Sequence, residues 1–206
     1  ISSPNFNIVS ERIKSFSKLC FFKKNKEKNI FLTTINALVT KTAPRSFYKK
    51  NFISLTNKTE HSLNTLTNFL INTGYKRVQT VRELCEFSLR GSILDIFPIG
   101  YSKAFRIDFF GQTIETIKVM DPLTQRSSAH VENINIYSSN EYLLSEENIE
   151  NFRKKFRSLY ANQSIKNSIY EKVSSGIKFN GIEHYLPLLH KEPLSSIFDF
   201  LPKDEE

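Results

Sequence analysis

Apolar residues recur every three or four positions in three stretches of the chain, and each stretch predicts an amphipathic helix. The first extends over residues 7–20. The second follows residues 57–59, which offer helix-capping side chains, and stops at Gly74. The third has Glu146 and Glu147 at its start and basic residues near its end, an order that suits the helix dipole. The apolar positions are Val9, Ile13, Phe16 and Leu19, then Leu63, Leu66, Phe69 and Leu70, and finally Ile149, Phe152, Phe156 and Leu159.

Between the second and third helices the pattern changes to one typical of strands. Residues 93–97 form a short apolar run that is broken only by Asp95, and residues 105–110 and 113–119 follow as two further strands. Gly111 and Gln112 separate the last two strands as a hairpin turn. The pattern predicts a three-stranded antiparallel unit covered by the preceding helix.

The strand at residues 105–110 has one apolar face and one polar face. Phe105, Ile107 and Phe109 share the first face, whereas Arg106, Asp108 and Phe110 share the second. An aromatic side chain beside an arginine is a composition typical of protein interfaces. The alternative is that Phe110 tucks under the hairpin turn, and the pattern alone does not decide between the two.

Two aspartates of this region, Asp95 and Asp108, can come from paired strands. Two carboxylates close together are one signature of acid–base catalysis. Arg90 and Arg106 lie nearby in the sequence, so we interpret the aspartates as salt-bridged or solvent-facing instead.

The N-terminal region contains a short apolar run at residues 30–32, followed by a helical pattern over residues 35–40 that ends before Pro44. This order predicts a buried strand and a helix, as in part of an α/β layer. The preceding basic loop, residues 21–28, places two phenylalanines beside lysines. Such a loop can contact nucleic acid, but we favour a solvated turn with two core-anchoring rings.

Composition changes this picture little. Hydrophobic residues make up 39% and charged residues 24% of the 206 positions, which is ordinary for a soluble, core-forming protein. No apolar run approaches the ~20 residues of a membrane helix. The formal net charge of +8 suits nucleic acid or an acidic partner, and equally the residue bias of an AT-rich genome. Two distant cysteines, Cys20 and Cys85, indicate a reducing cytoplasm and no disulfide framework.

The sequence lacks the motifs that would carry catalysis. It contains no Gly-x-x-x-x-Gly-Lys-Ser/Thr phosphate loop, no Gly-x-Ser-x-Gly and no His-Glu-x-x-His. Its histidines include no pair four residues apart, so a helical metal-binding pair is absent. They are His61, His130, His184 and His190. We therefore expect no catalytic, cofactor-binding or metal-binding residues in this chain.

Three separated stretches resemble proteins of bacterial excision repair. Residues 85–127, from CEFSLRGS to DPLTQRS, resemble the small inserted domain shared by the protein UvrB and the transcription-repair coupling factors. Residues 181–202, with GIEHYLPLL and SIFDFLP, resemble the return segment of the same module, and residues 10–47 resemble the coupling factors. The form DPLTQRS favours the coupling factors, and nothing like the tyrosine-rich hairpin of UvrB precedes Ser10.

The resemblance implies an α+β fold. A small antiparallel-sheet domain at residues 51–138 would be inserted in an incomplete RecA-like α/β domain, formed by residues 1–50 and 139–206. Cys85 stands where the family usually has glycine, and Ser92 where a small glycine or alanine is usual. Both departures lie close to Arg90 and bear on the local strand geometry.

The resemblance also implies a function. The family's module lacks a working ATPase site, and its inserted domain binds UvrA, which brings the excision machinery to a stalled RNA polymerase. The positions that match the family's contact residues are Arg90, Arg106 and Phe110, and we expect them to form one exposed patch. ATP, RNA polymerase and double-stranded DNA would be partners of the full-length parent, a cytoplasmic translocase that engages no membrane. The alternatives are a UvrB fragment and a generic basic nucleic-acid-binding domain.

Overall fold

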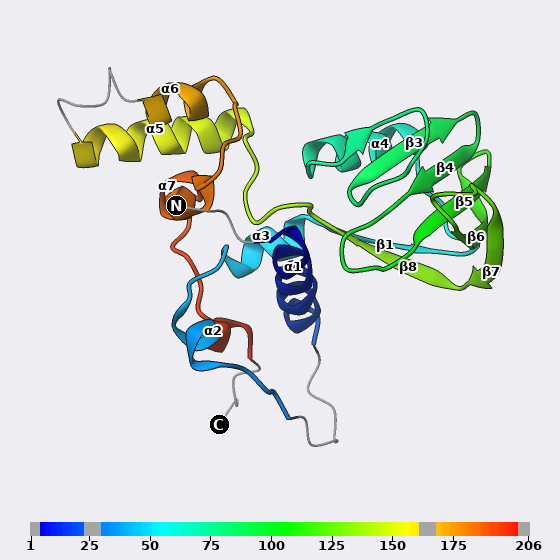
Figure 1. The fold of residues 1–206 in the computed structure, drawn as a ribbon, viewed down its shortest axis with the longest axis horizontal. Coiled ribbons are helices and arrows are strands. Elements are labelled where there is room, and N and C mark those ends of the chain that lie inside the picture. The colour runs from blue at the N-terminus through cyan, green and yellow to red at the C-terminus, as the bar shows by residue number, and fades with distance from the viewer. Residues whose placement is uncertain (1–4, 23–29, 161–167, 202–206) are drawn as a thin grey trace. The chain divides into compact units, whose positions relative to one another are not determined.

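The computed structural model describes residues 5–22, 30–160 and 168–201. The chain divides into two compact units (Figure 1). The sheet unit comprises Ser10–Lys14 and Asn51–Asn140, and the helical unit comprises the segments before and after it. The α+β class is confirmed, because one unit holds all the named strands of the described chain and the other is built from helices.

The sheet unit contains a six-stranded sheet with the order β2-β3-β4-β5-β6-β7. Only the β2–β3 pair is parallel. A separate two-stranded antiparallel sheet pairs β1 (Phe52–Thr56) with β8 (Asn133–Tyr137). The remaining strands are β2 (Lys76–Arg77), β3 (Glu86–Arg90), β4 (Ile93–Ile96), β5 (Ala104–Phe110), β6 (Thr113–Met120) and β7 (Ser127–Val131).

The predicted antiparallel unit is confirmed as β4, β5 and β6, which form the middle of the larger sheet. Helix α4 (Leu63–Asn72) precedes them and lies beside the sheet (Figure 1). Its cap is Ser62, whose hydroxyl accepts from the Thr65 N–H at 3.4 Å, so the cap predicted at residues 57–59 is wrong. Those residues form the turn after β1, where Lys58 adopts a positive φ of 65°. Gly74 ends the helix as expected, with a φ of 91°.

The two faces of β5 differ in burial as the alternation predicts. Phe105, Ile107 and Phe109 are buried, whereas Phe110 is exposed. A β-bulge interrupts the β5–β6 ladder, because Asp108 pairs with Thr116 and the next residue of β5 pairs with Ile114. The extra residue belongs to β6, so the alternation along β5 continues to its end.

Cys85 has a left-handed backbone conformation, with a φ of 64°. An L-residue with a Cβ atom is disfavoured there, and glycine is not. This explains why glycine suits the position and shows that cysteine occupies it at a conformational cost. The strands beyond it are undisturbed: Arg90 pairs with Ile93 across a two-residue turn in which Gly91 has a φ of 60°.

The helical unit gathers its elements from both ends of the sequence, and α1 contributes residues to each unit. A buried apolar cluster joins α5, α6, η2 and α7 through Phe152, Phe156, Val173, Ile182, Leu188 and Leu189. The elements are α1 (Phe6–Cys20), α2 (Ile35–Val39), α3 (Arg45–Lys50), α5 (Glu146–Tyr160), α6 (Ser168–Ser174), η2 (Ile182–Tyr185), α7 (Leu186–Leu189) and η3 (Ile197–Phe200). Helices α1, α2 and α5 confirm the helices that the apolar spacing predicted at these places.

The buried strand predicted at residues 30–32 is wrong. Ile30 and Leu32 are 85% and 93% exposed, and the run forms no strand. A strand needs a neighbour for its backbone hydrogen bonds, and the described part of the helical unit supplies only the isolated bridge between Thr42 and Ser195. The basic residues 23–28 lie outside the described residues.

The assignment of residues 1–50 and 139–206 to a RecA-like domain stays a prediction.

A buried polar network ties the first and last segments of the helical unit together. The Glu141 carboxylate accepts from the hydroxyls of Thr42 and Tyr48, each at 2.9 Å. The backbone carbonyl of Glu141 is 2.8 Å from His190 Nε2, which must donate to it. Burial lowers the pKa of His190, so the neutral ring is favoured in this environment. No helix in the described ranges is long and apolar enough to cross a membrane.

Candidate functional site

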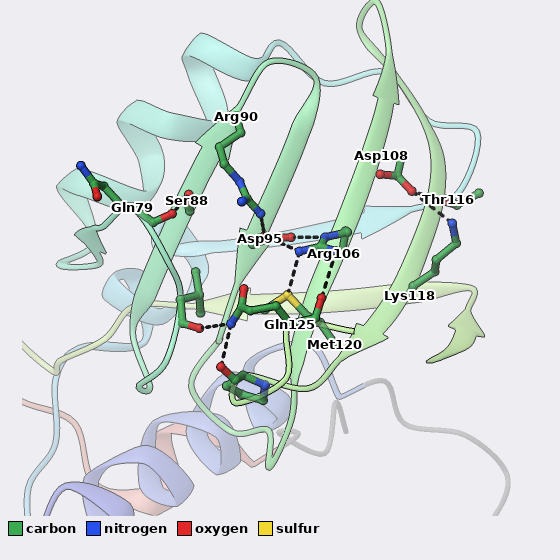
Figure 2. Close-up of polar contacts among 12 residues, drawn as sticks. Gln79, Ser88, Arg90, Asp95, Arg106, Asp108, Thr116, Lys118, Met120 and Gln125 are labelled. Atoms are coloured by element: carbon green, nitrogen blue, oxygen red, sulfur yellow. Dashed lines mark hydrogen bonds and ion pairs between the residues drawn. The ribbon is translucent and has the colours of Figure 1, made fainter. Parts of the chain in front are cut away.

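The centre of the polar sheet face is Asp95, a carboxylate that is 1% exposed and lies between two arginines (Figure 2). Arg106 donates from Nε to Oδ1 at 2.7 Å and from Nη2 to Oδ2 at 2.8 Å. Arg90 donates from Nη2 to Oδ2 at 2.7 Å. Strand register produces this arrangement, because Asp95 on β4 pairs directly with Arg106 on β5 and Arg90 ends the neighbouring β3.

Further contacts hold the guanidinium of Arg106 in place. Nη1 lies 3.3 Å from the carbonyl oxygen of Gln125, and Nη2 lies 3.3 Å from the sulfur of Met120. Gln125 has a positive φ of 61°, and its side-chain amide donates to the carbonyls of Val81 and Pro122 at 3.0 and 2.6 Å. Hydrogen bonding to Asp95 raises the pKa of Arg106. The last residue of β6 and the turn that follows it thus add two contacts that hold Arg106 beside Asp95.

The three residues predicted to form one exposed patch differ in exposure. The Arg106 side chain is 20% exposed and that of Arg90 is 55% exposed. Phe110 is 76% exposed, so the alternative in which it tucks under the hairpin turn is wrong. Strand alternation gives Phe110 the same sheet face as Arg106, and the structure brings the two arginines together on one carboxylate.

The second aspartate, Asp108, lies on the same face and has its own partners (Figure 2). Thr116 donates to its Oδ2 at 2.7 Å, and Lys118 approaches the same oxygen at 3.3 Å. Both aspartates are therefore salt-bridged, as the nearby arginines led us to expect for Asp95. Within the described ranges, no three His, Cys, Asp or Glu side chains gather as a metal site.

This face combines an exposed ring with fixed positive charge. Arg90, Arg106 and Lys118 outnumber Asp95 and Asp108 by one charge, and Phe110 offers apolar surface beside them. Guanidinium groups favour carboxylates in bidentate geometry, and aromatic rings are common interface anchors. The arrangement therefore suits a protein partner that presents a carboxylate and an apolar pocket.

Residues 53–142, which cover nearly the whole sheet unit, match the family model of the UvrB interaction domain. This part of the chain is similar to the UvrB interaction domain. Arg90, Arg106 and Phe110 all lie inside the matched range. Asp95, Met120 and the carbonyl of Gln125 lie inside it too; sequence reasoning placed Asp95 among the salt-bridged residues but gave the other two no role.

The surrounding segments are similar to transcription-repair-coupling factors. The protein of that name from Rickettsia conorii is 35% identical over 200 residues, that from Haemophilus influenzae 31% over 202, and that from Escherichia coli K12 30% over 200. The similarity covers 97–98% of this chain and confirms the resemblance seen in the motifs. The chain spans only 17–18% of the length of these relatives. The UvrB-fragment alternative is not favoured, because these relatives match both flanking segments as well as the interaction domain.

Proposed function

We propose that the sheet unit docks UvrA, using Arg90, Arg106 and Phe110. The observation that carries the proposal is the exposed ring of Phe110 on the same sheet face as an arginine pair anchored by a buried carboxylate. A phenylalanine that is 76% exposed at the end of a regular strand contributes little to folding and is available to a partner. Burying it against UvrA would supply the apolar part of the contact.

The wider role follows from the relatives and is part of the same proposal. In a longer protein resembling the transcription-repair-coupling factors, this module would recruit nucleotide excision repair to a stalled RNA polymerase. We assign ATP, RNA polymerase and double-stranded DNA to regions of that parent outside this chain. The chain itself would act by docking and not by catalysis.

The experiment is a titration of UvrA with the wild-type chain and with Phe110→Ala. We expect the variant to bind about 30-fold more weakly, because an interface anchor contributes ~2 kcal/mol or more. The matched control is Leu159→Ala, which removes a side chain that is also largely exposed but belongs to α5 of the helical unit. It should bind like the wild type. Equal binding by Phe110→Ala and the wild type would remove Phe110 from the site.

A duplex DNA titration separates this function from the nucleic-acid-binding alternative. The described basic residues of α5 already have partners inside the helical unit: Lys154 pairs with Glu150, and Lys155 donates to the carbonyls of Pro187 and His190. We therefore expect weak DNA binding that fades as salt rises. Tight, sequence-independent binding at physiological salt would favour the alternative.

A further inference from the structure

We propose that the two arginines have different tasks: Arg90 donates to a carboxylate of UvrA, whereas Arg106 and Asp95 form a support that aims Arg90. This inference rests on the proposed docking function. It states which side chain of the site contacts UvrA and which side chains only hold that one in position.

The donors of the two guanidinium groups are used very differently. Each group has five N–H donors. Arg106 directs its donors to both oxygens of Asp95, to the Gln125 carbonyl and to the Met120 sulfur, which occupies four of the five. Within the described chain, Arg90 makes one hydrogen bond, to Asp95. Arg90 thus retains the fork that a bidentate carboxylate contact needs, and Arg106 does not.

Exposure points the same way. The Arg90 side chain is more than half exposed, whereas that of Arg106 is one-fifth exposed. Redirecting Arg106 toward a partner would break several internal hydrogen bonds and leave the buried Asp95 with one cation instead of two, which is unfavourable for a charge in that environment. Arg90 can gain a partner without losing its bond to Asp95.

Asp95 is therefore a positioning residue. Its bond to Nη2 of Arg90 restricts a long side chain that would otherwise sample many rotamers. Arg106 in turn restricts Asp95 by gripping both of its oxygens. Ordering Arg90 before docking removes an entropic cost that binding would otherwise carry.

A double-mutant cycle on UvrA affinity tests this chain of contacts. The variants are Asp95→Asn, Arg90→Ala and the two combined, each titrated with UvrA. Asp95→Asn keeps the side-chain shape and should weaken binding roughly 10-fold in the wild-type background, but less than about 2-fold when Arg90 is already alanine. The same loss in both backgrounds would overturn the positioning role. Arg90→Lys keeps the charge but not the fork, so a variant that binds as tightly as the wild type would overturn the carboxylate contact.

A second measurement needs no substitution. Guanidinium nitrogen NMR of the wild-type chain should show slow rotation about the Nε–Cζ bond of Arg106. Rotation about the same bond of Arg90 should be faster, so that its Nη signals average more. Equal averaging in both groups would overturn the difference between them even if Asp95→Asn failed to fold.

Phe110→Ala distinguishes the failure of this inference from failure of the docking proposal. If Phe110→Ala still weakens UvrA binding while the double-mutant cycle shows no coupling, only the division of tasks between the arginines is wrong.

Discussion

The two faces of β5 receive adjacent phenylalanines and give them opposite roles. Phe109 is 4% exposed and packs in the core of the sheet unit, whereas its neighbour Phe110 is exposed on the face that carries the arginines. The same strand and the same residue type thus fill the core on one side and present an exposed ring on the other. The comparison teaches that residue type does not decide whether a phenylalanine is buried on β5. Its position in the alternation along the strand decides which sheet face it joins.

Truncating the buried ring should have the largest effect. We expect Phe109→Ala to lower the free energy of unfolding by ~3–5 kcal/mol, because it removes a buried aromatic ring and leaves a cavity. Urea denaturation measures this, and Phe110→Ala is the matched control on the other face, where a change within ~0.5 kcal/mol is expected. If Phe110→Ala were the destabilising variant and Phe109→Ala the silent one, the two faces would be reversed.

The second effect concerns Arg106, which belongs to the polar face but is held like a core residue. Arg106→Ala should lower the free energy of unfolding by ~2–3 kcal/mol, because it leaves the buried Asp95 with Arg90 as its remaining cation. Removing Asp95 as well, in Arg106→Ala/Asp95→Ala, should restore part of the loss. Thermal or urea unfolding of the single and double variants checks this, and a stability equal to that of the wild type would show Arg106 to be an ordinary exposed arginine.

The strand faces could be predicted because alternation is a local property of the sequence. The same holds for α1, α4 and α5, whose apolar spacing is visible within each helix. Residues 30–32 could not be placed, because an apolar run becomes a strand only when another segment pairs with it, and pairing is not local. The six-stranded sheet was underestimated for a similar reason: β7 is short and mostly polar, so only its pairing with β6 identifies it.

The sequence singled out the candidate residues but did not show how their side chains are held. Arg90, Arg106 and Phe110 followed from a resemblance, and the alternation of β5 pointed independently to Phe110. The grip of Arg106 on both oxygens of Asp95 depends on β4–β5 register, and the Gln125 carbonyl depends on a positive-φ turn. Both are tertiary features that composition and spacing do not encode.

The smallest expected effect concerns the backbone conformation of Cys85, the residue that precedes β3. Cys85→Gly should be more stable than Cys85→Ala by ~1 kcal/mol, because both remove the sulfur but only glycine adopts a positive φ without steric cost. Comparing the two variants by thermal melting isolates the backbone contribution from the lost side chain. If alanine were as stable as glycine, the left-handed conformation at this position would carry no cost.

The pairing of β1 with β8 also has a consequence for the order of folding. Thr42 must find Glu141 across 99 residues of sequence, and closing so long a loop is slow and entropically costly for an unfolded chain. Once the sheet unit has formed, Phe52 lies opposite Tyr137, so the two ends of that long intervening segment are already neighbours. The remaining loop then consists of ten positions from Thr42 to Phe52 and four from Tyr137 to Glu141. The helical unit should therefore complete its folding only after the sheet unit, as a kinetically dependent second step.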